Sequence, residues 1–416
     1  MFTAIHQALG VPRDAPLTYS MLEAAVTAGV VESDGLDWKR ALPPEAGLGA
    51  TDFPKDVAAM ANSGGGVIVF GVDEAEKRAT GLVDVGELTE RHERALRSAA
   101  VSAVHPPVFS LSVLRLQGDG GLAVAVVVPP SVDSPHVIYR GEYFGAPVRN
   151  DADTVWMKEP ALAAAYRGRF DAQRLHDETL GWLYEDAAAR CVPQMAWFVG
   201  AATPRRPQAP HRDRFPEPRT LVDKAFGISE AHLRAKDHLG RPVPRGRAPL
   251  REVDANNLRP GLRRWVAVPT STKAVHEAWA SFHLDGSVTL ACSLGGQRKD
   301  ADENFQATHF YSENLEAAVA NLMGMMRVAA GELDGEYEVR VGVEWDRREP
   351  VKMWTRDWLG YPNDGSSVPV PRYSPVVRTV DANDPAEGFV RQAVDLGLDC
   401  VNQGGITNLH HLPELT

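Results

Sequence analysis

Acidic residues stand close to two predicted strands near the start of this chain. Glu32 lies just before the first strand, Asp37 lies on it, and Asp73 ends the second. If the two strands are neighbours in a sheet, these carboxylates converge on one Mg²⁺ or Mn²⁺ ion, because hard cations prefer carboxylate oxygens. Such an ion activates water for phosphodiester cleavage, and Lys39 would steady the scissile phosphate or the attacking hydroxide.

The same spacing has a simpler interpretation. Asp37 and Lys39 alternate with Leu36 and Trp38, so they share one face of the strand. An ion pair between them on a solvated strand edge would contribute little stability and would need no function. Triplets of this kind are frequent by chance, so the spacing alone favours this second interpretation.

The elements around these residues are predicted from local patterns. Leu36–Lys39 alternates apolar and polar residues, as a half-buried strand does. Asp52 is suited to cap a helix that continues to Ala61. Val67–Val72 is apolar throughout, which is typical of a central strand covered on both faces.

Three glycines, Gly64–Gly66, join this helix to the central strand. They either permit positive φ angles and close packing, or let backbone N–H groups approach a phosphate. The chain contains no Gly-x4-Gly-Lys-Ser/Thr sequence, and the glycines follow a helix rather than a strand. Motifs therefore give no support to ATP binding, and the glycines are better interpreted as backbone geometry.

Four segments together are more specific than any one of them: ESDGLDWK at 32–39, AAMANSGGG at 58–66, FGVD at 70–73 and TG at 80–81. Further matches are Pro106, Pro129, Pro135 and the run from Tyr143 to Thr154 that contains Arg149. The combination resembles the AlbA-like domain of the Schlafen family over about residues 18–170. The resemblance implies an α+β fold, with a mixed sheet and packed helices.

The resemblance also implies an activity. Animal members of the family use this domain as a metal-dependent endoribonuclease on transfer and ribosomal RNA, and their catalytic acids correspond to Glu32, Asp37 and Asp73. Many bacterial relatives are described only as DNA-binding or ATP-binding, and often act as regulators or in phage defence. Asp37 stands where glutamate is commoner, and Asn150-Asp151 replaces the usual glycine after Arg149.

Basic residues suggest where nucleic acid would bind. Arg140, Arg149 and Lys158 would line a groove around the acids and contact phosphates, although each is equally well explained as ordinary surface charge. Pro204–Arg251 holds eight prolines and twelve Lys or Arg against five Asp or Glu. It is either a separate nucleic-acid patch or a solvated connector.

The length of 416 residues favours two or three domains. We expect an AlbA-like domain at 1–170, a helix with a basic proline-rich connector at 171–260, and a C-terminal α+β or α/β-type domain at 261–416. The net charge of −11 argues against a surface that binds nucleic acid everywhere. The three cysteines fit neither a disulfide framework nor a zinc site, and apolar runs are too short for a membrane span, so we expect a cytoplasmic protein.

The sequence thus predicts a Schlafen-type metal-dependent nuclease that uses Mg²⁺ or Mn²⁺, with structured RNA such as transfer RNA favoured over DNA and a role in antiviral defence. Two alternatives stay open. One is a non-catalytic DNA-binding regulator that uses the same groove. The other is a scaffold in a defence complex, in which the C-terminal part carries the function and the first domain forms a homo-oligomer.

Overall fold

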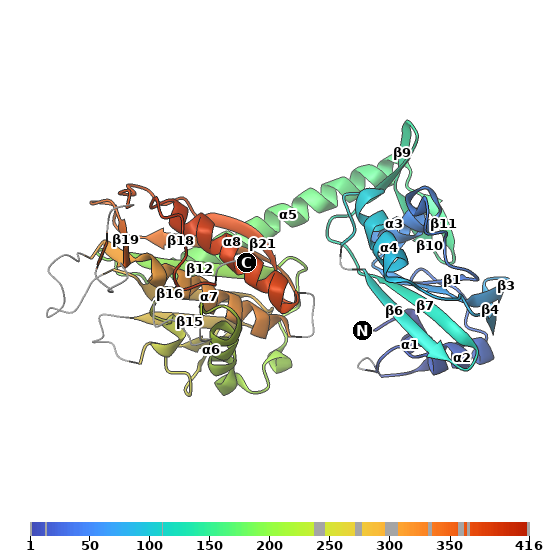
Figure 1. Cartoon of the computed structure of the whole chain (residues 1–416), viewed down its shortest axis with the longest axis horizontal. Coiled ribbons are helices and arrows are strands. Elements are labelled where there is room, and N and C mark those ends of the chain that lie inside the picture. The colour runs from blue at the N-terminus through green and yellow to red at the C-terminus, as the bar shows by residue number, and fades with distance from the viewer. Residues whose placement is uncertain are drawn as a thin grey trace. The chain divides into compact units, whose positions relative to one another are not determined.

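The computed structural model describes residues 2–12, 15–109, 111–236, 246–270, 277–295, 307–331, 335–356, 362–363 and 367–413. The chain divides into two compact units, Met1–Arg174 and Leu175–Thr416 (Figure 1). Each unit combines helices with strands that pair mostly antiparallel, which confirms the α+β fold class. Within the described ranges, no helix has the length and apolar character needed to cross a membrane.

A four-stranded mixed sheet forms the centre of the first unit. Its strands, in spatial order, are β1 (Leu36–Lys39), β2 (Gly66–Phe70), β7 (Gly121–Val128) and β6 (Ser112–Gly118). β1 and β2 run parallel, and the other two pairings are antiparallel. The parallel pairing places β1, which carries Asp37, beside β2, whereas Asp73 lies beyond the end of β2 on a separate strand.

Helices cover both faces of this sheet. On one face, α3 (Phe53–Asn62) and α4 (Glu90–Ser102) pack with Ile68 and Phe70 of β2. On the other face, α1 (Ala4–Leu9) and α2 (Tyr19–Ala28) pack with Val67 and Val69. Successive side chains of a strand point to opposite faces, and both faces of β2 are covered by helices. This is why β2 is apolar throughout.

Short strands extend the first unit beyond the main sheet. They are β3 (Val72–Ala75), β4 (Arg78–Leu82), β5 (Val104–His105), β8 (Val137–Arg140), β9 (Tyr143–Gly145), β10 (Pro147–Asn150) and β11 (Asp153–Trp156). They form the small sheets β3-β4, β5-β8-β9 and β10-β11. The fold also includes a short 3₁₀ helix, Leu48–Ala50.

One long helix, α5 (Glu159–Ala188), follows the last of these strands. The residue pattern predicts two helices here, Glu159–Arg167 and Asp171–Arg190, and this prediction is wrong. A single glycine in a helix costs only about 1 kcal/mol and does not by itself end it. The boundary between the units, at Arg174 and Leu175, falls inside α5.

A seven-stranded sheet forms the centre of the second unit, and all its pairings are antiparallel. The unit is therefore α+β, and the label α/β does not describe it. Its strands, in spatial order, are β13 (Arg259–Gly261), β14 (Arg264–Ala267), β15 (Ala278–His283), β16 (Val288–Ser293), β12 (Trp197–Pro204), β18 (Glu336–Glu344) and β21 (Val376–Asp381).

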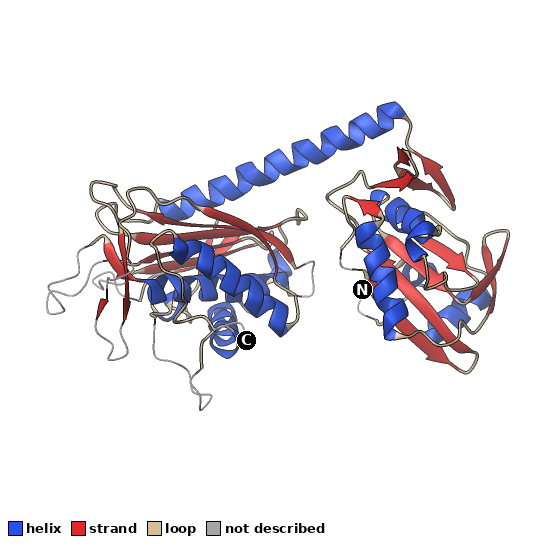
Figure 2. Ribbon diagram, turned by 45° about the horizontal axis from the view of Figure 1, so that its top comes forward, coloured by secondary structure: helices blue, strands red, loops and turns tan. Residues whose placement is uncertain are grey.

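Helices cover both faces of this sheet too, as Figure 2 shows. The end of α5 packs on one face, where Leu183 and Tyr184 contact Val199 and Ala201 of β12. The other face carries α6 (Leu221–His232), α7 (Ser312–Ala330) and α8 (Ala386–Asn402). A smaller sheet of β17 (His309–Tyr311), β19 (Lys352–Arg356) and β20 (Pro362–Asn363) completes the unit, with 3₁₀ helices at Arg212–Arg214, Pro218–Thr220 and Pro249–Arg251.

Most of the stretch 171–260, expected to contain a connector, belongs instead to the second unit, which begins at Leu175. β12 lies within the seven-stranded sheet between β16 and β18, and every residue of β12 is buried. Leu221, Val222 and Ala225 of α6 are buried in the main core. The prolines that suggested a connector lie outside these two elements or at the end of β12, so they bound the elements without preventing them from packing.

A buried carboxylate near the start of α7 makes the stability of this unit depend on pH. Oε2 of Glu316 accepts backbone N–H groups from His410, His411 and Leu412, at 2.8, 2.6 and 3.2 Å. Burial raises the pKa of Glu316 to about 7, although these hydrogen bonds oppose the change. The folded protein therefore holds this proton more tightly than the unfolded chain, so stability falls as the pH rises through about 4.5 to 7.

Glu316→Gln removes the charge and keeps an acceptor for the three N–H groups. We expect the free energy of unfolding of the wild type, relative to this variant, to fall between pH 4.5 and pH 8, by up to about 3 kcal/mol. Urea denaturation at a series of pH values measures this difference. Parallel pH profiles for the two proteins would contradict the expectation.

Candidate functional site

Asp37 lies at the centre of a buried group of charges in the first unit. Leu36 and Trp38 point into the core on the side of α1 and α2, so Asp37 faces the opposite side. Its Oδ2 lies 2.5 Å from Nζ of Lys39, and its Oδ1 lies 3.1 Å from Nη1 of Arg149. Since Asp37 is almost fully buried, these two cations are what makes its charge tolerable.

Arg149, from β10, holds several segments together. Its side chain is only 3% exposed. Besides pairing with Asp37, its Nη2 donates to the carbonyl oxygens of Ser33 and Leu36, at 3.3 and 3.4 Å. A guanidinium buried in this way cannot meet the phosphate backbone of a nucleic acid without rearrangement, so the structure places Arg149 under the site rather than in a binding groove.

Asp56 of α3 is a member of this group of charges that sequence reasoning missed. It is buried, and burial followed by the nearby charge of Asp37 raises its pKa. It also lies near Lys39, whose pKa is raised on balance by Asp37 and Asp56 although burial opposes this. The sequence does contain a sign of this burial. Phe53 and Met60 are apolar and lie three residues before and four residues after Asp56, so the three share the inward face of the helix.

Glu32 is the second predicted acid that the structure brings to this place. Its Oε1 accepts the backbone N–H of Trp38 at 2.9 Å, and its side chain is buried. Burial raises the pKa of Glu32, and the charge of Asp37 adds to this effect. Glu32 therefore lies within the electrostatic influence of Asp37.

Asp73 is held differently. It lies on β3, which pairs with β4, and its carboxylate forms an ion pair with Arg40. Within the ranges that the structure describes, no three Asp, Glu, His or Cys side chains are grouped closely enough to hold a metal ion. As arranged here, Glu32, Asp37 and Asp73 do not fit a shared Mg²⁺ or Mn²⁺ ion.

The glycine turn and the residues before it shape the surroundings of the acids. Gly64 and Gly65 adopt positive φ, and a Cβ on Gly66 would lie 2.7 Å from Sδ of Met60 and 2.9 Å from the carbonyl oxygen of Gly35. This geometry agrees with the interpretation of the glycines as packing residues.

Asn62 connects the end of α3 to two distant strands. Its Nδ2 donates to the carbonyl oxygens of His136 and Pro147, and its Oδ1 accepts the backbone N–H of His136 at 2.7 Å. The next residue, Ser63, accepts the backbone N–H of Arg149 at 2.8 Å. These bonds fix the start of β8 and the position of Arg149 relative to the acids.

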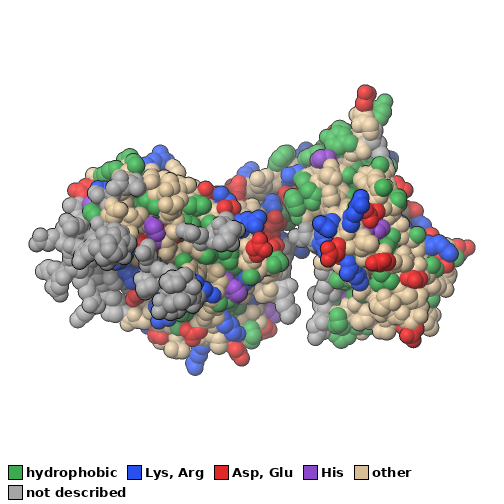
Figure 3. Space-filling view, in the orientation of Figure 1, with side chains coloured by type: hydrophobic (Ala, Val, Ile, Leu, Met, Phe, Trp, Pro, Cys, Tyr) green, Lys and Arg blue, Asp and Glu red, His purple; other side chains and the backbone are tan. Residues whose placement is uncertain are grey.

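Exposed aromatic side chains gather on the hairpin of β8 and β9. Tyr139 and Phe144 lie directly opposite each other, with ring centroids 5.8 Å apart, and each is 56% exposed. His105 of β5 packs edge-on against Tyr139, and Tyr143 near the turn is 80% exposed. The hairpin projects from its unit in Figure 1, and hydrophobic side chains gather on it in Figure 3.

We call Tyr139, Tyr143 and Phe144 the aromatic hairpin. An exposed cluster of aromatic rings of this kind marks an interaction surface, because such rings are normally buried. The sequence alone does not single out this surface, because only the pairing of β8 with β9 brings the rings of Tyr139 and Phe144 together.

The remaining predicted phosphate contacts are placed less specifically. Arg140 lies on β8 opposite Tyr143, and its side chain lies outside the described residues. Lys158 is exposed just before α5. Lys39 is 39% exposed, so part of its charge faces solvent beside the acids.

Residues 32–158 match the family model described as Schlafen, AlbA_2, so the chain contains a Schlafen AlbA-like domain. No curated protein matches the chain. One similar solved structure is the N-terminal domain of a protein from Nitrosomonas europaea described as related to the ATP-dependent DNA helicase RecG. It is 20% identical, covers 35% of this chain and 94% of its own, and has a TM-score of 0.25.

A second similar structure is the DIP2311 protein of Corynebacterium diphtheriae. It is 14% identical, covers 53% of this chain and 43% of its own, and has a TM-score of 0.24. At these TM-scores the two likenesses say nothing about function.

Proposed function

We propose that the first unit binds nucleic acid, with RNA favoured over DNA, and that the aromatic hairpin is its main contact. The observation that carries this proposal is the grouping of three exposed rings on one short hairpin within a Schlafen AlbA-like domain. Each ring offers a flat face on which an unpaired base can stack, and stacking tolerates any base.

The preference for RNA follows from what stacking requires. Proteins recognise RNA mostly at loops, bulges and ends, where bases are already unstacked and can lie on aromatic rings. Duplex DNA keeps its bases inside the helix. The net charge of −11 also favours a contact that depends on stacking together with a few local cations, such as Lys39 and Lys158, over broad phosphate binding.

Fluorescence anisotropy on the full chain tests the proposal with three probes: a transfer-RNA transcript, a single-stranded oligonucleotide and a DNA duplex. We expect the first two to bind more tightly than the duplex. The dependence of log K on log salt should be shallow, with a slope of about −2 if three cations meet phosphates. Equal affinity for duplex and single strand, or no binding at low salt, would contradict the proposal.

Metal-dependent cleavage of RNA is a second candidate function. The buried carboxylates of Glu32 and Asp37 favour it, because burial raises the pKa of Glu32 and acids with shifted pKa values are commoner at catalytic sites than elsewhere. The arrangement of Asp73 does not fit, since its carboxylate is paired with Arg40. A metal ion would therefore need Asp73 to leave Arg40, and we derive no catalytic step from the present geometry.

Cleavage of end-labelled RNA in the presence of Mn²⁺ decides this second candidate. If it holds, Glu32→Gln and Asp73→Asn each lower the rate by at least about 100-fold and leave RNA affinity unchanged. Cleavage that persists in both variants would contradict the assignment of these acids. A wild-type protein that binds RNA but cleaves none with any divalent ion would act as a regulator or as a scaffold in a defence complex.

A further inference from the structure

A groove of about 540 Å³ runs along α6 in the second unit. Its apolar lining includes Phe215, Leu221, Ile228 and Val328, contributed by α6, by α7 and by the chain before α6. The volume lies within the range of about 300–1,000 Å³ that is usual for small-molecule sites.

Cations outnumber acids around this groove. Arg214, Lys224 and Arg327 line it, and so does His232. The one carboxylate among the lining residues belongs to Glu217, whose oxygen lies 4.0 Å from Nζ of Lys224. The lining therefore carries an excess of positive charge in a chain that is acidic as a whole.

Arg214 and Arg327 differ in the contacts that their guanidinium groups make within the protein. The guanidinium of Arg327 donates to the carbonyl oxygen of Asp384 and lies 4.1 Å from the ring centroid of Phe389, so it has a structural role. Nε of Arg214 is buried and has no hydrogen-bond partner within the described ranges. No carboxylate among the same residues forms an ion pair with Arg214 within 4.0 Å, so its positive charge is not neutralised by a neighbouring acid there.

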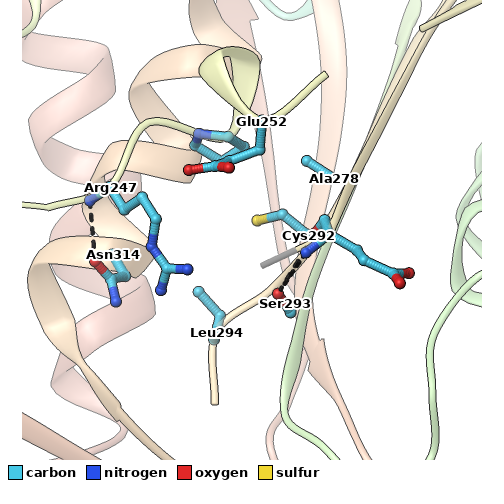
Figure 4. Close-up of a pocket in the computed structure, with 9 residues that line it drawn as sticks. Arg247, Glu252, Ala278, Cys292, Ser293, Leu294 and Asn314 are labelled. Atoms are coloured by element: carbon cyan, nitrogen blue, oxygen red, sulfur yellow. Dashed lines mark hydrogen bonds between the residues drawn. The ribbon is translucent and has the colours of Figure 1, made fainter. Parts of the chain in front are cut away.

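A second cavity in the same unit offers a contrast (Figure 4). Arg247, Asn314 and Cys292 line it, and its volume is only about 10 Å³. That is room for about one water molecule, which would hydrogen-bond to the buried Nη1 of Arg247. A substrate or effector cannot enter a space of this size, so the groove along α6 is the better candidate.

We propose that the groove along α6 binds a small organic anion that consists of an apolar ring and a phosphate or carboxylate group. The ring would lie on the apolar lining formed by Ile228 and Val328, and the anionic group would meet Arg214 with Lys224 nearby. Arginine suits this task because it can donate two parallel hydrogen bonds to a phosphate or a carboxylate. The second unit would then sense a small molecule.

Isothermal titration calorimetry on the full chain tests this proposal with four probes. AMP and GMP carry a phosphate, benzoate carries a carboxylate, and adenosine is the uncharged control. We expect at least one anion to bind in the micromolar range and adenosine to bind at least about tenfold more weakly than AMP if AMP is the anion bound. Binding of the nucleotides identifies phosphate as the anionic group, and binding of benzoate alone identifies carboxylate.

Two variants locate the binding. Arg214→Ala should weaken it at least about tenfold, as expected for the loss of a charge-assisted hydrogen bond. Ile228→Trp should abolish it by filling the groove while leaving the Arg214 side chain in place. Arg219→Ala is the matched control, because Arg219 is exposed on the neighbouring 3₁₀ helix and does not line the groove.

The proposal is overturned if none of the three anions binds below about 1 mM, a limit that corresponds to very weak affinity. It is also overturned if Arg214→Ala and Arg219→Ala bind the anion alike, or if AMP binds and adenosine binds as tightly as AMP. Thermal melting of each variant identifies any that fails to fold, and in that case Ile228→Trp and Arg214→Ala substitute for each other.

Discussion

Replacing Arg149 by alanine is expected to destabilise the first unit by about 3–5 kcal/mol. The substitution leaves Asp37 buried with Lys39 as its remaining charged partner, and the carbonyl oxygens of Ser33 and Leu36 lose a donor. A buried charge that loses its partner costs far more than the pair itself contributes. Chemical denaturation, monitored by tryptophan fluorescence and by hydrogen exchange of β1 and β10, measures the loss.

Two comparisons make this result specific. Arg40→Ala breaks the exposed ion pair with Asp73 and should cost less than about 1 kcal/mol. Adding Asp37→Asn to Arg149→Ala should recover part of the stability, since the uncompensated charge is then removed. If Arg149→Ala lowers the free energy of unfolding no more than Arg40→Ala does, then Arg149 does not hold these segments of the first unit together.

The double variant Tyr143→Ala, Phe144→Ala is expected to weaken RNA binding by about 30-fold or more. Stacking of a base on an aromatic ring is worth about 1–3 kcal/mol, and about 1.4 kcal/mol corresponds to a tenfold change in affinity. Both rings are exposed, so their removal should leave the free energy of unfolding almost unchanged. Anisotropy titrations with the single-stranded and transfer-RNA probes measure the change.

Trp182→Ala is the matched control for this variant. Trp182 is 59% exposed on the part of α5 that belongs to the second unit, so it tests whether any exposed aromatic ring contributes to binding. Its affinity should stay within about twofold of the wild type, a difference of less than 0.5 kcal/mol. If the Tyr143→Ala, Phe144→Ala variant binds RNA as tightly as Trp182→Ala does, the aromatic hairpin does not contribute to RNA binding.

Local patterns predicted much of the first unit correctly. β1 has the bounds expected from the alternation of Leu36–Lys39. The glycines between Gly118 and Gly121 predict a hairpin turn, and β6 and β7 pair across this turn. Period-two alternation and glycine turns are local properties, so a single sequence contains them. In the second unit, the helical spacing of the apolar residues from Leu315 to Met326 predicts a helix over Ser312–Ala330, and α7 has these bounds.

Proline content misled the prediction where packing decides the structure. β12 and α6 lie in the stretch expected to hold a connector, yet both contribute to the main core of the second unit. Their burial depends on strands and helices that come much later in the chain, such as β18 and α7. Such long-range partners cannot be identified from the local composition of residues 204–251.

The candidate site was predicted in part. Glu32 and Asp37 are both buried in the first unit, and the family match over residues 32–158 confirms the predicted AlbA-like domain. The roles of Arg149 and Asp56 depend on how β10 and α3 pack against β1, which the sequence does not state. The metal site and the RNA substrate stay predictions. Asp73 would have to break its ion pair with Arg40 before its carboxylate could bind a metal ion.

The most direct test of the central claim is photocrosslinking of the full chain to a single-stranded RNA that carries 4-thiouridine, followed by mass spectrometry of the crosslinked peptides. We predict that the main crosslinks lie between residues 137 and 145, on Tyr139, Tyr143 or Phe144, and that an excess of unlabelled RNA removes them. Crosslinks confined to the second unit, with none on the aromatic hairpin, would contradict the claim that the first unit binds nucleic acid through this surface.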